Sequence, residues 1–395
     1  MGRQAGRTDG TRNSSTASYA SPRRKKVRWH TKVGDIEVLE PQYRSGTQSV
    51  RPFVRSAKVG HRSCSLPLQR AITDFAADQP FAQARSKLQE HYGLAVAEST
   101  IQRIVLAHAQ AMFEAARAPR VFPEAPGRHK YIVAETDGGM IPIVEPGANQ
   151  KDKRKGKKLL WKEAKISLAH PKGSRTPIYA ATIEGGVEIA GRQLFECAVR
   201  AGFGANSHVH AVGDGAPWIV GQVEERFGVQ GAYLIDFYHV CEYLSEAAKA
   251  IVPDLAAQEA WMDAQEDALK TGRLENVLQR LASRREPPEV DDERAPIRRC
   301  HRYLRARRNQ LNYREALAKD LPIGSGEIES AHRYIAQQRL KLPGAWWRTD
   351  HADYMLSLRV TRRNGDWPAY WAALSKNRPT AANRNRPSVS RKSAA

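Results

Sequence analysis

The chain has 395 residues, of which 41% are hydrophobic, so it is long enough to bury a large core and to form more than one domain. Its 63 Lys and Arg against 42 Asp and Glu give a formal net charge of +21, which indicates a polyanionic partner, with nucleic acid as the first candidate. No apolar run approaches the roughly 20 residues of a membrane-spanning helix, and the N-terminus lacks the apolar core of a secretion signal. The four cysteines form no C-x-x-C pair, which fits a reducing cytoplasm.

The positive charge is concentrated at the two ends of the chain. Residues 1–62 hold 14 basic and 4 acidic residues, and residues 376–395 hold 6 basic and no acidic residues. Both segments are rich in Ser, Asn, Arg and Pro, so we expect a partly disordered N-terminal arm and a disordered tail that bind nucleic acid; the alternative is that they only aid solubility. Within the arm, residues 1–28 are predicted to be disordered, and residues 31–40 and 49–59 to form a short hairpin.

Residues 63–118 are predicted to form three helices, over residues 67–78, 81–93 and 98–116. Gly93 suits the C-terminal end of the second, and the Ser99 to Gln102 spacing suits a capping box at the start of the third. This layout is typical of a helix-turn-helix, in which the second helix of the motif enters the major groove and would place Gln102 and Arg103 at base edges. A plain helical bundle fits the same pattern, and the basic flank favours DNA binding.

Residues 128–375 are predicted to form a mixed α/β domain. Three consecutive strands, then helix, strand, helix and strand, give the order of an RNase H-like fold. The first strand covers residues 130–144, a charged hairpin tip follows at residues 150–158, and the fifth strand covers residues 231–240. A helical insertion of about residues 242–319 separates this strand from the last helix.

Two aspartates are predicted to end neighbouring strands of this sheet. Asp137 is expected to end the first strand and Asp214 the fourth, and in an RNase H-like sheet these strands are adjacent. Carboxylates that close repel unless a cation neutralises them, and hard oxygen ligands suit Mg²⁺ or Mn²⁺. The last helix offers Glu327 and Glu329 as a third acid, while Glu135 is a weaker candidate. The alternative is that each aspartate is a turn residue or a helix cap.

The segments "TDGG", "VGDGAPWI", "LIDFYHVCEYL" and "IGSGEIESAHRYIAQQRLKLPGAWW" resemble those of bacterial insertion-sequence transposases of the DDE class, in particular the ISKra4-like group. The resemblance covers roughly residues 66–375. It implies a triad of Asp137, Asp214 and Glu329 that holds two Mg²⁺ or Mn²⁺ ions on an RNase H-like core, with Glu327 as the second choice for the third acid. Related N-terminal regions often carry a cysteine-rich zinc ribbon, whereas the N-terminal region of this chain has Cys64 as its only cysteine, with His61 nearby.

The resemblance also suggests DNA contacts outside the triad. Asp236 and His239 resemble a C/D-x-x-H signature, which implies that His239 contacts DNA or positions the scissile phosphate; the alternative is a polar residue that closes a strand. Arg339 and Lys341 follow the third acid and are candidates for phosphate binding. Trp346 and the neighbouring Trp347 suit either base stacking or a core anchor, and the core anchor is favoured.

These observations predict a DNA transposase that binds the terminal inverted repeats of its element and catalyses metal-dependent cleavage and strand transfer. The expected partners are double-stranded DNA, as element ends and as target, and further copies of the chain in a dimer or higher oligomer; no membrane partner is expected. We expect a cytoplasmic protein that associates with the nucleoid when bound. Two alternatives are a nuclease that cuts without strand transfer and an inactive or domesticated DNA-binding regulator.

Overall fold

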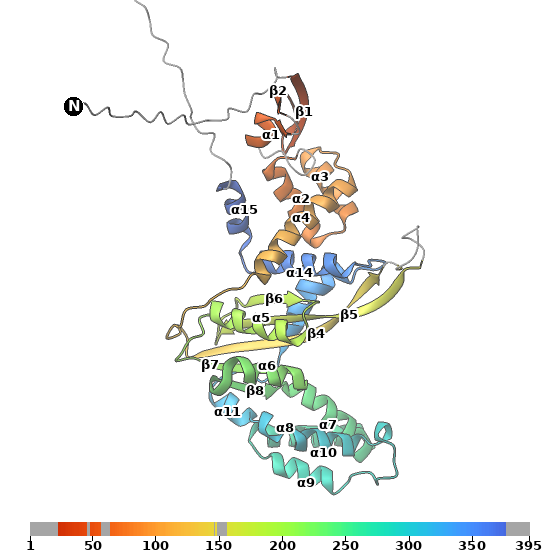
Figure 1. The fold of residues 1–395 in the computed structure, drawn as a ribbon. Helices are drawn as coiled ribbons and strands as arrows, with labels where there is room; N and C mark the ends of the chain where they lie inside the picture. Colours follow the sequence, from red (N-terminus) through yellow and green to blue (C-terminus); the bar gives the residue numbers. More distant parts are fainter. Residues whose placement is uncertain (1–22, 46–47, 57–63, 146, 148–155, 377–395) are drawn as a thin grey trace, which may run out of the picture. The chain divides into compact units, whose positions relative to one another are not determined.

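The computed structural model describes residues 23–45, 48–56, 64–145, 147 and 156–376 (Figure 1). The predictions of disorder for residues 1–22 and for the tail from residue 377, and most of the predicted hairpin tip, lie outside these residues. The described chain forms two compact units. The first contains residues up to 76, residues 81–104 and residues from 369 onward, and the second contains residues 77–80 and 105–368.

The first unit contains a three-stranded antiparallel sheet in the order β1-β2-β3. Its strands are β1 (Arg23–Thr31), β2 (Gly34–Ser45) and β3 (Gln48–Val50). The prediction of disorder was wrong for residues 23–28, because β1 pairs with β2 along its whole length and buries Val27. The predicted hairpin strand from residue 49 ends at Val50 and is followed by α1 (Pro52–Ser56), since proline suits the first turn of a helix.

The three predicted helices are present as α2 (Leu66–Asp78), α3 (Phe81–Tyr92) and α4 (Glu98–Arg117). Gly93 has a φ of +65° and donates its N–H to the Gln89 carbonyl, as expected of a residue that ends a helix. The predicted capping box was wrong. The Ile101 N–H donates to the Ala97 carbonyl over 3.1 Å, so α4 already begins at Glu98 and Ser99 lies inside its first turn.

The second unit is a mixed α/β structure built on a five-stranded sheet, and this part of the fold prediction is confirmed. The strand order is β6-β5-β4-β7-β8, with β4 in the centre and β7 beside it. The strands are β4 (Tyr131–Glu145), β5 (Lys158–Pro171), β6 (Ile178–Thr182), β7 (His208–Gly213) and β8 (Gly231–Ile235). β5 is antiparallel to β4 and β6, whereas β7 is parallel to β4 and β8.

Helices cover both faces of this sheet. The side chains of β4 alternate between the two faces, so each face has side chains for helices to bury. Ile132 and Ala134 belong to one apolar cluster with α5 (Gly186–Arg200) and α6 (Pro217–Phe227). Glu135 points to the opposite face, where its carboxylate accepts a hydrogen bond from α12 (Gly326–Ala331). The central strand is therefore buried on both sides over its first half.

The chain from Phe237 to Ala318 is helical and has its own apolar cluster, which also includes Leu234 and Ile235 of β8. Its helices are α7 (Phe237–Ile251), α8 (Leu255–Lys270), α9 (Leu274–Ala282), α10 (Pro296–Ala306) and α11 (Tyr313–Ala318). The predicted fifth strand was too long. It ends at Ile235, because the Asp236 carboxylate caps α7 by accepting the Tyr238 N–H over 2.7 Å and the His239 N–H over 3.3 Å.

After the helical segment the chain returns to the sheet. It continues from α12 through a π-helical turn, η4 (His332–Gln337), into α13 (Gln338–Leu340), α14 (Thr349–Arg363) and α15 (Trp367–Lys376). Among the described residues, none of the helices has the length and apolarity needed to span a membrane.

Candidate functional site

Asp137 and Asp214 occupy equivalent positions on neighbouring parallel strands. β4 and β7 pair in a constant register that ends at Glu135 opposite Val212, and each aspartate lies two residues beyond that last pair. The sequence predicted that Asp137 ends its strand, but β4 continues beyond it. Its pairing with β5 continues to the end of β4, opposite Lys158, and keeps the backbone extended past the point where β7 stops.

The Asp137 carboxylate is partly exposed and has two contacts within the protein. Its Oδ1 accepts the Gly138 N–H over 2.6 Å, and its Oδ2 lies 3.3 Å from Nε2 of the buried His332. Gly139 makes room for this imidazole, since a Cβ on Gly139 would lie 2.6 Å from His332 Nδ1. Sequence reasoning missed His332, although it follows Glu329 by three residues, a spacing that places both on one side of a helix.

The Asp214 carboxylate is exposed at the end of β7. Its Oδ1 accepts the Ala216 N–H over 2.8 Å, so the turn that the sequence offered as an alternative is present, although this side chain does not cap α6. The backbone of the turn is held separately. The Tyr303 hydroxyl donates to the Asp214 carbonyl over 3.0 Å, and the Gly215 N–H donates to the Tyr233 hydroxyl over 2.9 Å. One carboxylate oxygen of Asp214 is thereby fixed and the other faces solvent.

Asp236 is a buried carboxylate that ties three segments together. In addition to capping α7, it accepts hydrogen bonds from the Ser325 N–H over 2.7 Å and from the Ser325 hydroxyl, just before α12. Its own N–H donates to the Gly213 carbonyl over 2.7 Å. The ends of β7 and β8 and the start of α12 are therefore joined at one point. An aspartate between an apolar strand and a helix is a helix-cap signal, but sequence reasoning did not assign it this role.

The first turn of α12 lies against β4 through Glu135. This carboxylate accepts the Ile328 N–H over 2.8 Å and is only 2% exposed. Burial, opposed by the Ile328 N–H and reinforced by the neighbouring carboxylates of Glu327, Asp236 and Glu329, raises the pKa of Glu135 to about 8.

The two candidate third acids differ in their partners. Glu327 lies with its Oε2 3.1 Å from Nε2 of His170, so it is already engaged with β5. Glu329 is exposed and has no ion-pair partner among the described residues. This difference favours Glu329 as the acid that is available to a ligand.

The donor set of Asp137, Asp214 and Glu329 consists of carboxylate oxygens, which suit a hard divalent cation. Asp137 and Asp214 are presented at equivalent positions, two residues beyond the last pair of β4 and β7. Within the described part of the chain, no group of three or more His, Cys, Asp or Glu side chains is arranged to hold a metal ion. The chemistry of the residues fits a divalent cation, and a third ligand would have to move toward the two aspartates.

The predicted DNA contacts differ in exposure. Gln102 and Arg103 are exposed on α4, and Lys341 is exposed after α13. His239 lies in the first turn of α7, with its Nδ1 3.4 Å from a Glu242 oxygen.

Arg339 is only 2% exposed. Its guanidinium lies 4.7 Å from the centroid of the Trp347 ring, and burial lowers its pKa to about 10. This position favours a packing role for Arg339 over a phosphate contact. Trp347 is likewise buried, whereas Trp346 is 39% exposed.

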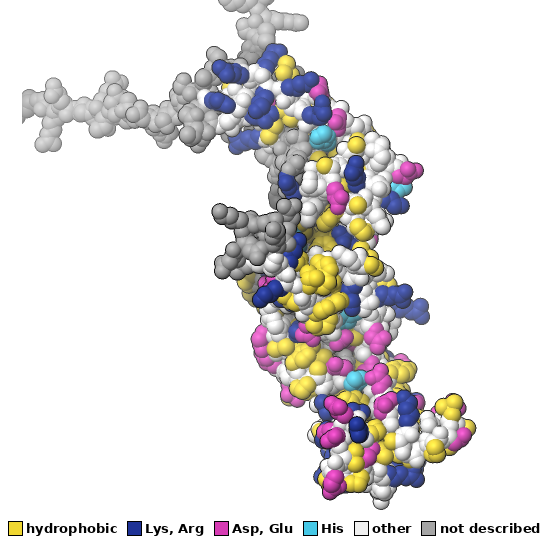
Figure 2. Space-filling view, turned by 90° about the vertical axis from the view of Figure 1, so that its right-hand side faces the viewer, with side chains coloured by type: hydrophobic (Ala, Val, Ile, Leu, Met, Phe, Trp, Pro, Cys, Tyr) yellow, Lys and Arg dark blue, Asp and Glu magenta, His cyan; other side chains and the backbone are white. Residues whose placement is uncertain are grey.

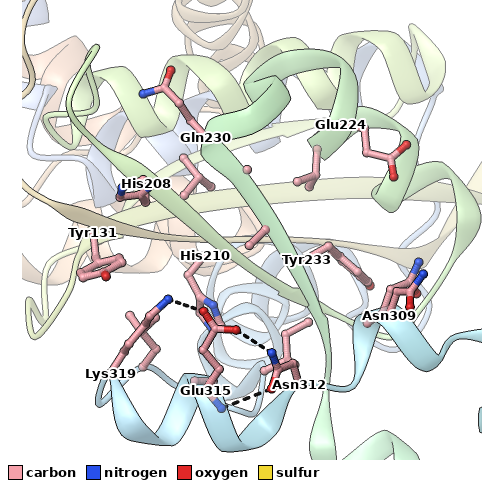
Figure 3. A pocket seen from close by; sticks show the side chains of 18 of the residues that line it. Tyr131, His208, His210, Glu224, Gln230, Tyr233, Asn309, Asn312, Glu315 and Lys319 are labelled. Carbon is pink, nitrogen blue, oxygen red and sulfur yellow. Dashed lines mark hydrogen bonds and ion pairs between the residues drawn. The ribbon is translucent and has the colours of Figure 1, made fainter.

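A separate cavity of about 550 Å³ lies beside the edge strand β8, between the sheet and α11. Figure 3 shows Lys319 and Asn312 both directed at the carboxylate of Glu315, which pairs with them. His210, also in the lining, has its Nε2 2.7 Å from the Pro322 carbonyl oxygen. None of Asp137, Asp214 and Glu329 is among the lining residues, and several of its polar groups are already paired within the protein.

A family model described as "Uncharacterised protein family (UPF0236)" matches residues 195–370. The matched segment contains Asp214, Asp236 and Glu329 but not Asp137. Its description assigns no activity. A comparison with curated proteins found no significant match.

Proposed function

We propose that this protein is a DNA transposase of the DDE class with an RNase H-like catalytic core. The observation that carries the proposal is the shared register of Asp137 and Asp214, each two residues beyond the last pair of β4 and β7. The sheet order, with three antiparallel strands followed by two parallel ones, supports the fold. The net charge of +21 supports a nucleic-acid substrate.

In this proposal Asp137, Asp214 and Glu329 hold two Mg²⁺ or Mn²⁺ ions. Such ions supply an activated oxygen nucleophile and neutralise charge on the leaving oxygen of a phosphodiester. The chain itself orients the ligands. The Gly138 and Ala216 N–H groups each fix one oxygen of an aspartate. Water would attack the phosphodiester at the element end and release a 3′-hydroxyl there. This hydroxyl would then attack a phosphodiester of the target DNA and displace the 3′-hydroxyl of the target strand.

The first unit is proposed to recognise the element ends. The strand β1 is rich in Lys and Arg, and α4 presents the exposed Gln102 and Arg103. Phosphate contacts from such residues make binding steeply dependent on salt, and base contacts add specificity. The helix-turn-helix assignment of α3 and α4 belongs to this proposal, as does a dimer or higher oligomer on paired ends.

The test is a strand-transfer assay with Mg²⁺, a pre-cleaved terminal-repeat duplex and a target plasmid. Asp214→Asn should abolish product while DNA binding and the circular dichroism spectrum remain those of the wild type. Asp263→Asn, which changes an exposed carboxylate of α8, is the matched control and should retain activity. Full activity of Asp214→Asn would disprove the proposed metal role. Cleavage without strand transfer by the wild type would indicate a nuclease instead.

A further inference from the structure

The β4–β5 ribbon presents exposed apolar side chains beyond the point where β7 ends. The antiparallel register places Met140 opposite Glu163, Pro142 opposite Trp161, and Val144 opposite Leu159, so all of these share one face of the ribbon. Met140 is 48% exposed, Leu159 59% and Trp161 52%. Large apolar side chains that gather on one exposed face indicate a binding surface.

A second tryptophan reaches this face from the segment that follows α13. That segment pairs with the free edge of β4. The Trp347 N–H donates to the Pro142 carbonyl over 3.3 Å, and the Val144 N–H donates to the Trp347 carbonyl over 2.7 Å. Trp347 is buried on one face of the ribbon. Successive side chains of an extended segment alternate, so its neighbour Trp346 points to the opposite face, which also carries Trp161. The ring centroids of Trp346 and Trp161 lie 6.2 Å apart at an interplanar angle of 62°.

A cation beside these rings is the second observation. Lys341 Nζ lies 5.9 Å from the centroid of the Trp161 ring and makes no ion pair with a described residue. The acid on this face, Glu163, is already paired with Lys165. Figure 2 shows hydrophobic side chains gathered near the middle of the view, with Lys and Arg side chains beside them.

We propose that Trp161 and Trp346 form a stacking platform for unpaired bases of single-stranded DNA, with Lys341 binding the adjacent phosphate. Exposed indole rings stack on bases of any sequence, and an unpaired cation beside them matches the phosphate backbone. The edge-to-face arrangement leaves ring surface open, and a phosphate would draw Lys341 away from Trp161. This inference rests on the proposed function, since DNA ends that are cut and transferred expose unpaired strands.

The test measures the anisotropy of a labelled oligothymidylate and of a blunt duplex of the same length, using the full chain. The double variant Trp161→Ala, Trp346→Ala should raise the Kd for the single strand at least about 10-fold, because it removes both stacking rings. The Kd for the duplex should change less than about two-fold. Trp161→Phe, Trp346→Phe should restore most of the affinity, because phenylalanine also stacks.

Two further variants separate stacking from general effects. Leu255→Ala removes an exposed apolar side chain from α8, outside the ribbon, and should leave single-strand binding unchanged. Lys341→Ala should weaken binding and lower the salt slope by about one. Unchanged single-strand affinity of the double variant would overturn the platform. So would a double variant that only loses self-association in sedimentation velocity, because the face would then bind a second copy.

The two proposals fail in distinguishable ways. If the wild type performs strand transfer but the tryptophan variants bind the single strand normally, the platform is wrong and the transposase proposal stands. If the variants lose single-strand binding but neither the wild type nor Asp214→Asn shows strand transfer, the platform stands and the catalytic proposal is wrong.

Discussion

Two neighbouring strands of the sheet are each followed by an aspartate, and the two aspartates differ in burial and in hydrogen bonding. β7 ends at Gly213 and is followed by Asp214, and β8 ends at Ile235 and is followed by Asp236. Asp236 is 5% exposed and receives hydrogen bonds from α7 and from Ser325. Asp214 is exposed and uses one oxygen for a local turn. A carboxylate that is saturated by the protein is structural, and one with an open oxygen remains available to a ligand.

The largest effect is expected at the aspartates that are proposed to bind metal. Asp137→Asn should lower the strand-transfer rate by about 10²- to 10³-fold, the loss typical of removing one group that stabilises developing charge. The free energy of unfolding in urea should change by less than about 0.5 kcal/mol, because this carboxylate is partly exposed. A large loss of stability with unchanged activity would show that Asp137, like Asp236, stabilises the fold and does not act in catalysis.

Asp236→Ala should act mainly on stability. The substitution leaves the N–H groups of Tyr238 and Ser325 without their acceptor in a buried setting, so we expect a loss of about 3 kcal/mol in urea unfolding. Asp263→Ala, in an exposed position on α8, provides the control and should lie within about 0.5 kcal/mol of the wild type. Equal stabilities for the two variants would show that the hydrogen bonds of Asp236 contribute little to the free energy of unfolding.

Asp353, another buried carboxylate, extends the comparison to the pH dependence of stability. Burial raises the pKa of Asp353 to about 6 from 3.8, although the Ile183 and Glu184 N–H groups oppose the shift. The folded state therefore binds this proton more tightly than the unfolded state. The stability of the wild type relative to Asp353→Asn should fall by up to about 3 kcal/mol as pH rises from 3.8 to 6, and should then level off. Urea unfolding of both proteins across this range measures the stability difference. A difference that rises with pH would contradict a raised pKa of Asp353.

The smallest effect is expected at the backbone support of Asp214. Tyr303→Phe removes the hydroxyl that donates to the Asp214 carbonyl, so we expect a loss of about 1 kcal/mol in unfolding free energy. If this hydrogen bond also positions the turn, strand transfer should slow by a few-fold while DNA affinity is retained. Leu317→Ala, an exposed apolar position on α11, is a control for the helical segment. An unchanged rate would limit Tyr303 to a role in stability.

Several features were predictable from the pattern of residues alone. Alternation in β4 and β7 and the 3.6-residue period of α2 to α4 predicted these elements, because burial of one face imposes its period on the sequence. The adjacency of Asp137 and Asp214 followed from an assumed strand order, and the register of β4 and β7 agrees with it. Two of the wrong predictions concern how an element ends or begins. The hydrogen bonds of Asp236 end β8, and the bond from the Ile101 N–H to the Ala97 carbonyl places Ser99 inside α4 rather than at its cap; periodicity reveals neither.

By itself, the sequence determined the mixed α/β class, the excess of positive charge and the identity of the acids, since composition and periodicity are local properties. Tertiary structure alone decided which acid is buried. Asp214 and Asp236 are both strand-end aspartates, and only the arrival of Ser325, 89 residues after Asp236, saturates one of them. It also placed His332 beside Asp137 and Trp346 beside Trp161. Such pairs depend on long-range packing, which sets the exposure and therefore the chemistry of each side chain.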